Sequence, residues 1–372
     1  MLAKLGQMMF DAKRQLVVLT GMFSLCCAMP NVANAIDLTD ISAVYFFGDS
    51  LTDSGFNNTF NKPFYFESPN LQFKDPNFTT YGGHTWAQYI ANDIIHTPFV
   101  PPDTLFPTLT DVMTNNSTPT YNYPPLPYPP LLPLTQGTNF ACGGARTNAE
   151  PGITITWAPS VTHQVQNYLT NYAPEVLDPK AVYFLWSGAN DMLYGFQTYT
   201  APDQAPQFIA LIDQTTTQIV NLVDQLSQRG AERVVVLSLP NIGVTPLILS
   251  QGTVAEQNAK NLTFIFNSLL NQKLGAFRKK NRHVKILYFD TYSALDNLIK
   301  NAKEGKTTYG FLFDNVTDPV CTYPPSQVNE PLAIYCTGEI APHYLFADLV
   351  HPTDQAHRVL SLELEEQILL WN

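Results

Sequence analysis

The chain reads AVYFFGDSLTDSG at residues 43–55, where an apolar run ends in a Gly-Asp-Ser turn. Residues 43–47 show no polar alternation and are rich in valine, tyrosine and phenylalanine, which is typical of a buried parallel strand. Ligands of open α/β sheets bind at the carboxyl ends of such strands. Gly48 permits a tight turn there. The stretch therefore predicts that Ser50 presents its hydroxyl and its own N–H to a ligand at the edge of a parallel sheet.

Other apolar runs have the same character. We expect strands at residues 181–186, 233–239 and 284–289, and a fifth at about 138–141. Helical patterns separate these runs, and the expected helices cover residues 86–96, 207–228, 253–280 and 353–370. Strands that alternate with helices predict an α/β fold in which helices cover both faces of a parallel sheet. Because crossover connections are right-handed, the sheet is expected to be doubly wound.

A proline-rich stretch at about 97–136 interrupts this pattern. We interpret it as a long surface insertion, partly in polyproline II conformation, within a single domain of residues 36–372. Two interpretations of the insertion stay open. It is either a disordered excursion or a lid beside the site.

The first 35 residues have the composition of a secretory signal. Lys4, Lys13 and Arg14 precede an apolar run at residues 16–29, and Ala33-Asn34-Ala35 provides a small-residue cleavage site. The run is shorter than the roughly 20 residues that a membrane-spanning helix needs. The sequence therefore predicts an exported protein, either periplasmic or secreted.

The chain is acidic, with a formal net charge of −11. Removing the basic N-terminal segment would make the remainder more acidic still. A protein that binds nucleic acid needs a basic surface, and so does one that docks electrostatically on anionic lipid. We therefore expect no nucleic-acid partner, and any transient contact with a membrane surface should be apolar.

Three cysteines follow the signal segment, and an oxidising compartment permits a disulfide. Cys321 and Cys336 are the natural pair because they enclose a short loop rich in proline, whose closure is worth about 3 kcal/mol in the chain-entropy model. Cys142 is then left over. It is interpreted as a small buried residue beside Gly143.

A second chemical block, DLVHPT, occupies residues 348–353. A serine at neutral pH needs a general base, and an imidazole serves best when a carboxylate fixes its tautomer. Asp348 and His351 supply both groups on a loop before the last expected helix. Taken alone, the block is also compatible with a helix cap and a solvated histidine.

Two further blocks offer donors for a developing oxyanion. Residues 138–145 end an expected strand in two glycines, whose backbone N–H groups can approach a ligand closely. The turn SGAND at residues 187–191 follows another strand, and the Asn190 side chain can donate an N–H. Read singly, both are ordinary strand-to-helix turns.

No cofactor or metal is expected, because neither a His-Glu-x-x-His motif nor a paired cysteine cluster occurs. His343 is interpreted as structural or exposed. We expect Asp49, Asp53 and Asp191 to brace turns through hydrogen bonds, although they could in principle bind a cation.

The four blocks, in their order along the chain, resemble the GDSL (SGNH) hydrolase family over residues 46 to about 369. The resemblance implies a three-layer α/β/α fold with about five parallel strands. It also implies Ser50 as nucleophile, Asp348 and His351 as its activating pair, and an oxyanion hole of Ser50, Gly144 and Asn190. Within the family the strings are most similar to bacterial secreted phospholipases A, lysophospholipases and glycerophospholipid:cholesterol acyltransferases, and the last group has a loop similar to that between Cys321 and Cys336.

Three functions remain open. The first is hydrolysis of lipid acyl esters, in which a sterol hydroxyl is an alternative acceptor to water. The second is a carbohydrate O-acetylesterase on the same fold. The third is a non-catalytic surface binding protein. The protein is expected to be a monomer.

Overall fold

The computed structural model describes residues 38–54, 78–80, 83–95, 138–153, 158–320 and 343–371. The chain divides into the units Met1–Asn34 and Ala35–Asn372, and every described residue belongs to the second. The expected signal segment, the proline-rich insertion and the loop from Cys321 to Cys336 lie outside the described residues. The single-domain assignment stays a prediction.

The central sheet contains four parallel strands in the order β1 (Val44–Gly48), β2 (Val182–Trp186), β3 (Arg233–Leu237) and β4 (Lys285–Phe289). A short extended segment pairs in parallel with the other edge of β1. There the Phe46 N–H donates to the Thr138 carbonyl at 3.0 Å, and the Phe140 N–H donates to the Phe46 carbonyl at 2.8 Å. The expected fifth strand is thus present as this edge segment.

The order of these segments places a topological switch point at β1. The edge segment around Asn139 follows β1 in sequence and lies on one side of it, whereas β2 lies on the other. In doubly wound sheets the crevice at such a point is where ligands bind. The turns that follow β1, the edge segment and β2 carry Ser50, Gly144 and Asn190.

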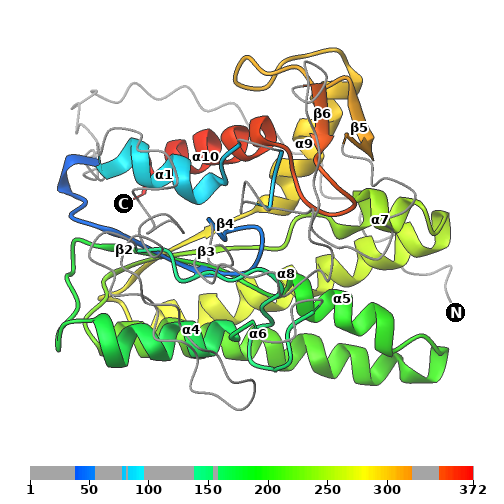
Figure 1. Cartoon of the computed structure of the whole chain (residues 1–372). Coiled ribbons are helices and arrows are strands. Elements are labelled where there is room, and N and C mark those ends of the chain that lie inside the picture. The colour runs from blue at the N-terminus through cyan, green and yellow to red at the C-terminus, as the bar shows by residue number, and fades with distance from the viewer. Residues whose placement is uncertain are drawn as a thin grey trace, which may run out of the picture. The chain divides into compact units, whose positions relative to one another are not determined.

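Helices cover both faces of the sheet, with α1 and α10 on one side and α4, α6 and α8 on the other (Figure 1). Alternate residues of β1 account for the two cores: Tyr45 and Phe47 pack toward α4, α6 and α8, and Val44 and Phe46 toward α1 and α10. The expected three-layer α/β/α fold is confirmed. The helices are α1 (Trp86–Ile95), α4 (Val161–Asn167), α5 (Ala189–Thr198), α6 (Ala205–Gln228), α7 (Pro246–Leu249), α8 (Thr253–Lys280), α9 (Thr291–Lys303) and α10 (Asp354–Leu369), with single turns at Leu38–Asp40, Tyr168–Tyr172, Pro202–Gln204 and Ile242–Val244.

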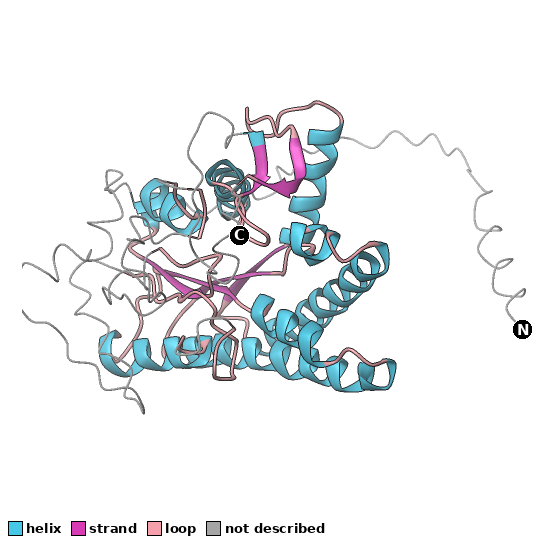
Figure 2. Cartoon of the chain, turned by 45° about the vertical axis from the view of Figure 1, so that its right-hand side comes forward, coloured by secondary structure: helices cyan, strands magenta, loops and turns pink. Residues whose placement is uncertain are grey.

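A second, two-stranded sheet of β5 (Asn315–Pro319) and β6 (Tyr344–Phe346) stands apart from the central sheet beside α9 (Figure 2). Leu298 of α9, Phe313, Leu345 of β6 and Val359 of α10 share a small apolar core. This core anchors the loop that carries Asp348 and His351. No helix among the described residues combines the length and apolar character required to span a membrane.

Candidate active site

Ser50 lies in the tight turn that ends β1. The Asp49 carbonyl accepts hydrogen bonds from Thr52 N at 3.0 Å and Asp53 N at 2.9 Å, and the Asp49 carboxylate accepts one from Leu51 N at 3.1 Å. A Cβ at Gly48 would stand 2.6 Å from the Trp186 carbonyl oxygen, so the turn requires glycine there. These contacts fix the backbone on both sides of the serine.

Hydrogen bonds join the side chain of Gln164 in α4 to the end of β1. Its Oε1 accepts from Gly48 N at 2.9 Å, and its Nε2 donates to the Gly48 carbonyl at 2.8 Å and to the Pro159 carbonyl at 3.2 Å. Gln164 is buried. Nothing in the sequence singles out Gln164, because its partner is 116 positions away.

The loop between β6 and α10 brings Asp348 and His351 to Ser50. His351 Nε2 lies 2.8 Å from Ser50 Oγ, and His351 Nδ1 lies 2.6 Å from the Asp348 carboxylate. The other Asp348 oxygen accepts from the N–H groups of Val350 at 2.8 Å and His351 at 2.7 Å. The three side chains form one continuous chain of hydrogen bonds.

Burial of Asp348 by itself would raise its pKa, but His351 and the two backbone donors lower the pKa below the usual value. The carboxylate is therefore ionised and oriented by its backbone bonds. It can hold the proton-bearing Nδ1 of His351, which leaves Nε2 to accept a proton from Ser50.

Gly144 and Gly143 differ in what their N–H groups do. The Gly143 N–H donates to the Asp53 carboxylate at 2.7 Å. No hydrogen bond within the described residues uses the N–H of Gly144 or of Ser50. Gly144 has φ +77°, a left-handed conformation that favours glycine, and its carbonyl accepts from Ile153 N at 2.9 Å.

Asn190 is the second residue of α5, which follows β2, and its Nδ2 donates to the Ala145 carbonyl at 3.0 Å. Ser50, Gly144 and Asn190 line the same cavity as His351. Two backbone N–H groups and one amide side chain therefore border the space beside Ser50 Oγ. Such a group of donors is suited to stabilising an oxyanion.

Asp191 ties the Gly144 turn to α5. Its carboxylate accepts from Arg146 Nε at 3.2 Å and from Thr147 N at 2.8 Å, and the Arg146 guanidinium lies 3.9 Å from the centre of the Tyr194 ring. Burial raises the pKa of Asp191 against these bonds. Burial likewise raises the pKa of Asp49 to about 7. As expected, Asp49, Asp53 and Asp191 brace turns.

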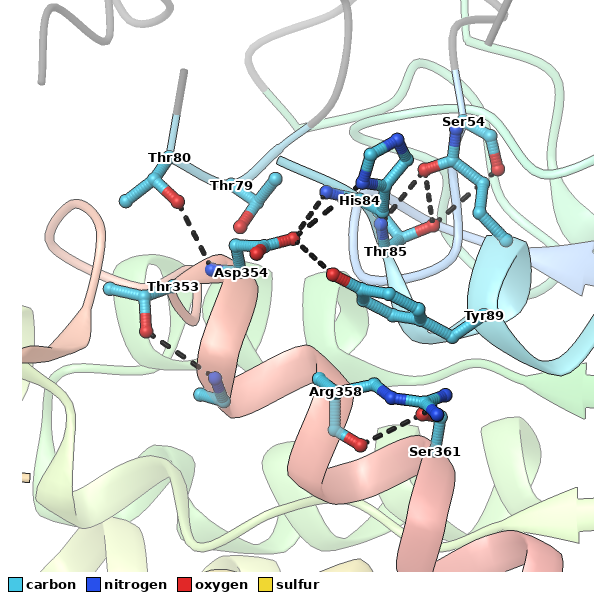
Figure 3. A network of polar contacts seen from close by, with 12 residues as sticks. Ser54, Thr79, Thr80, His84, Thr85, Tyr89, Thr353, Asp354, Arg358 and Ser361 are labelled. Carbon is cyan, nitrogen blue, oxygen red and sulfur yellow. Dashed lines mark hydrogen bonds and ion pairs between the residues drawn. The ribbon is translucent and has the colours of Figure 1, made fainter. Parts of the chain in front are cut away.

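The carboxylate of Asp354 joins α10 to the segment around α1 (Figure 3). It accepts from His84 N at 2.7 Å and from Tyr89 Oη at 2.7 Å, while the Thr80 hydroxyl contacts Asp354 N at 3.1 Å. Nearby, the Phe78 ring lies 5.1 Å from the His351 ring. This contact network fixes the first turn of α10, which directly follows the His351 loop.

Three other titratable side chains have distinct surroundings. His343 forms an exposed ion pair with Asp314 at 2.9 Å. Cys142 is buried, as expected, and burial raises the pKa of its thiol. His357 is fully buried, and burial with the nearby His351 lowers its pKa to about 3. Within the described ranges, no cluster of His, Cys, Asp and Glu is arranged to hold a metal ion.

A cavity of about 370 Å³ opens beside Ser50. Its polar end contains Ser50, Gly144, Asn190 and His351, and the rest of its wall is mainly apolar. The apolar lining comprises Leu51, Phe78, Ile153, Trp186, Ala189, Leu193, Pro240, Ile242, Leu247, Ala294, Leu295, Leu298, Leu345, Phe346, Leu349, Val350, Pro352, Ala356, Val359 and Leu360.

Comparison with known proteins gives one family match across most of the chain. Residues 44–364 match the family described as GDSL-like Lipase/Acylhydrolase. GDSL esterase/lipase At2g40250 of Arabidopsis thaliana is 24% identical over 355 residues, which cover 89% of this chain and 91% of that protein. Secreted effector protein SseJ of Salmonella typhimurium is 23% identical over 333 residues, covering 90% and 65%. Among solved structures, the acetyl xylan esterase AlAXEase matches with a TM-score of 0.39 at 13% identity, covering 87% of this chain and 98% of that one.

Proposed function

Because the chain belongs to the GDSL-like lipase/acylhydrolase family and is therefore an acyl-ester hydrolase, we propose that it is an exported serine esterase acting on lipid acyl esters. Ser50 is the nucleophile, His351 the general base, and Asp348 the carboxylate that orients His351. The observation that carries this proposal is the 2.8 Å contact between His351 Nε2 and Ser50 Oγ at the mouth of a largely apolar cavity.

The reaction has two halves. In the first, His351 Nε2 takes the Ser50 proton as Oγ attacks the ester carbonyl, and the resulting oxyanion is stabilised by the N–H groups of Ser50 and Gly144 and by Asn190 Nδ2. The tetrahedral intermediate then collapses, and His351 returns the proton to the leaving alcohol. In the second half, His351 deprotonates a water that attacks the acyl-serine, which releases the acid and restores Ser50.

The apolar cavity favours a lipid acyl group over an acetyl group as the acyl part of the substrate. An acetyl group adds a single methyl to the ester carbonyl, whereas the cavity reaches apolar side chains of α9 and α10 such as Leu298 and Leu360. Burial of each methylene of a longer acyl chain against such a lining contributes about 0.8 kcal/mol of transfer free energy. Lysophospholipid and phospholipid are the proposed substrates, with a sterol hydroxyl as an alternative acceptor to water.

Export is proposed on two grounds. Residues 1–35 have the composition of a secretory signal. The similar protein SseJ is described as a secreted effector.

Contact with a lipid surface would be apolar and transient, since the chain is acidic. The half-exposed Leu349 lies between Asp348 and His351 at the cavity and is placed to make such a contact.

The test is fatty acid release from lysophosphatidylcholine and from diacyl phosphatidylcholine, with and without cholesterol, by the wild type and by Ser50→Ala. We expect release that depends on Ser50, and a sterol ester product would identify acyl transfer. Release from acetylated xylan alone would instead assign a carbohydrate O-acetylesterase. If an organophosphonate fails to label Ser50 and no ester is cleaved, the protein is a binding protein and the proposal is wrong.

A further inference from the structure

The cavity follows the carboxyl edge of the central sheet. Gly48, Trp186, Leu237 and Phe289 are aligned across the four strands. Trp186 is itself part of the lining, and residues that follow β1, β3 and β4 also line it, including Ser50, Pro240 and Thr291. The cavity therefore extends from the nucleophile after β1 to the start of α9 after β4.

The distance between these ends follows from strand spacing. Ser50 and Thr291 each lie two residues beyond an aligned position, and three strand spacings separate β1 from β4. Spacings of about 4.8 Å give about 14 Å in all. Because each C–C bond advances an extended chain by about 1.25 Å, this distance corresponds to about eleven bonds.

Two helices form the walls near the β4 end. Positions 291, 294, 295 and 298 of α9 line the cavity, and so do positions 356, 359, 360 and 363 of α10. Each set repeats at three and four residues, so each occupies one face of its helix. Apart from Thr291 at the start of α9, the lining positions of both helices are apolar until Glu363.

Glu363 marks the far end of this space. Apart from Asp348 and His351, it is the one ionisable side chain among the described residues that line the cavity. Burial, together with Glu366 and Asp290, raises its pKa, and the influence of Asp290 places Glu363 near the start of α9. The terminal methyl of an acyl chain would gain nothing from a carboxyl group there.

We propose that this cavity is an acyl-chain channel that runs from Ser50 to Thr291 and Glu363 and selects medium-length chains of about ten to twelve carbons. The inference rests on the proposed function, since it needs Ser50 to carry the acyl group. Ala294 and Glu363 are specificity-determining residues in this arrangement. Neither contacts the reacting atoms.

The first test narrows the channel at its β4 end. Ala294→Phe places a ring in the cavity, and Asn297→Phe on the exposed side of α9 is the matched control. The substrates are p-nitrophenyl acetate, butyrate, octanoate, decanoate, dodecanoate and hexadecanoate. We expect wild-type kcat/KM to be highest at decanoate or dodecanoate, and Ala294→Phe to lower that value by about tenfold or more while butyrate changes little. Butyrate turnover also reports that the variant is folded.

The second test removes the carboxyl group at the end of the channel that lies far from Ser50. Glu363→Ala is compared with Glu366→Ala, which loses the same carboxyl group from an exposed position of α10. The ratio of hexadecanoate to decanoate turnover should rise about fivefold or more in Glu363→Ala and stay constant in the control. If Ser50-dependent hydrolysis occurs but neither variant changes the chain-length profile, the channel is wrong and the esterase assignment stands. If no ester is cleaved in a Ser50-dependent way, the proposed function itself fails.

Discussion

Gln164 forms a pair of hydrogen bonds with the backbone of Gly48, accepting from its N–H at 2.9 Å and donating to its carbonyl at 2.8 Å. A side chain of α4 thus accepts the Gly48 N–H at the end of β1, while Cys142 N of the edge segment donates to the same Gly48 carbonyl at 3.2 Å. Two residues further on, the chain reaches Ser50. The position of the nucleophile therefore depends on a residue outside all four sequence blocks.

Replacing Gln164 should affect both stability and turnover. Gln164→Ala leaves the buried Gly48 N–H without its acceptor, which we expect to lower the free energy of unfolding by about 1–3 kcal/mol. It should also reduce kcat more than it changes KM, because the Ser50 turn loses its support. Urea unfolding and steady-state kinetics measure the two effects. The exposed Gln228→Ala is the control, and equal behaviour of the two variants would contradict the positioning role.

Asp348→Asn should abolish most activity while preserving the fold. The amide oxygen can still accept from the backbone donors, but an amide no longer stabilises the charged form of His351. We expect kcat to fall by about 10³- to 10⁴-fold. The thermal midpoint should remain near that of the wild type. A loss of less than about tenfold would mean that Asp348 does not orient the base.

Asn190→Ala tests the proposed oxyanion donors. Removal of one such donor typically costs about 3–4 kcal/mol of transition-state stabilisation. We therefore expect kcat to fall by about 10²- to 10³-fold with a small change in KM. Asn190→Ala also removes the bond to the Ala145 carbonyl, so its unfolding must be measured alongside. A large rise in KM with kcat unchanged would place Asn190 in ground-state binding instead.

The contributions of Asp49 and Glu365 to the stability of the protein should fall as the pH rises from about 4 to 7. Burial raises the pKa of Asp49 to about 7, and burial together with Asp93 raises the pKa of Glu365 to about 7. In this interval the folded protein retains protons on these two groups that the unfolded chain has released, so their contribution to the free energy of unfolding decreases with increasing pH, opposite to that of His357, whose pKa burial lowers to about 3. Asp49→Asn removes one of these contributions, so the free energy of unfolding of the variant should rise relative to that of the wild type as the pH increases. The exposed Asp203→Asn should leave the slope of the pH dependence unchanged, and urea unfolding across the interval measures both.

Asp354→Ala should loosen the junction between α10 and α1. It removes the acceptor shared by His84 N and Tyr89 Oη, which we expect to cost about 1–3 kcal/mol of stability. The His351 loop precedes α10 directly, so kcat should fall as well. Hydrogen exchange should become faster in α1 and in the first turn of α10. Faster exchange throughout the central sheet would instead indicate general destabilisation.

The strands and long helices could be predicted because their signals are local. The expected helix at 253–280 has the bounds of α8, and the expected strand at 181–186 differs from β2 by one residue. The pattern at residues 187–191 indicates only a strand-to-helix turn, because Gly188 precedes α5 and the first residues of the helix are Ala189 and Asn190. The shorter α9 and the strands β5 and β6 were also missed, since their apolar faces are completed by residues distant in sequence.

The residues of the site also divide into those with a local sequence signal and those whose partners are distant in sequence. Each block contains residues of recognisable chemistry, so Ser50, Gly144, Asn190, Asp348 and His351 could be named before their geometry was known. Gln164 and Asp354 could not, because their partners lie 116 and up to 274 positions away. The residues that react were visible in the sequence, and the residues that hold them were not.

Ser50 and His351 are 301 positions apart, although their side chains are in contact. All four central strands end by Phe289, so during synthesis the sheet can assemble while the histidine is still being translated. Catalytic competence is therefore acquired only after the sheet, when the loop that carries His351 has emerged and docked. Until then, an ester-cleaving protein made inside a cell is by this arrangement inert toward the esters of its maker.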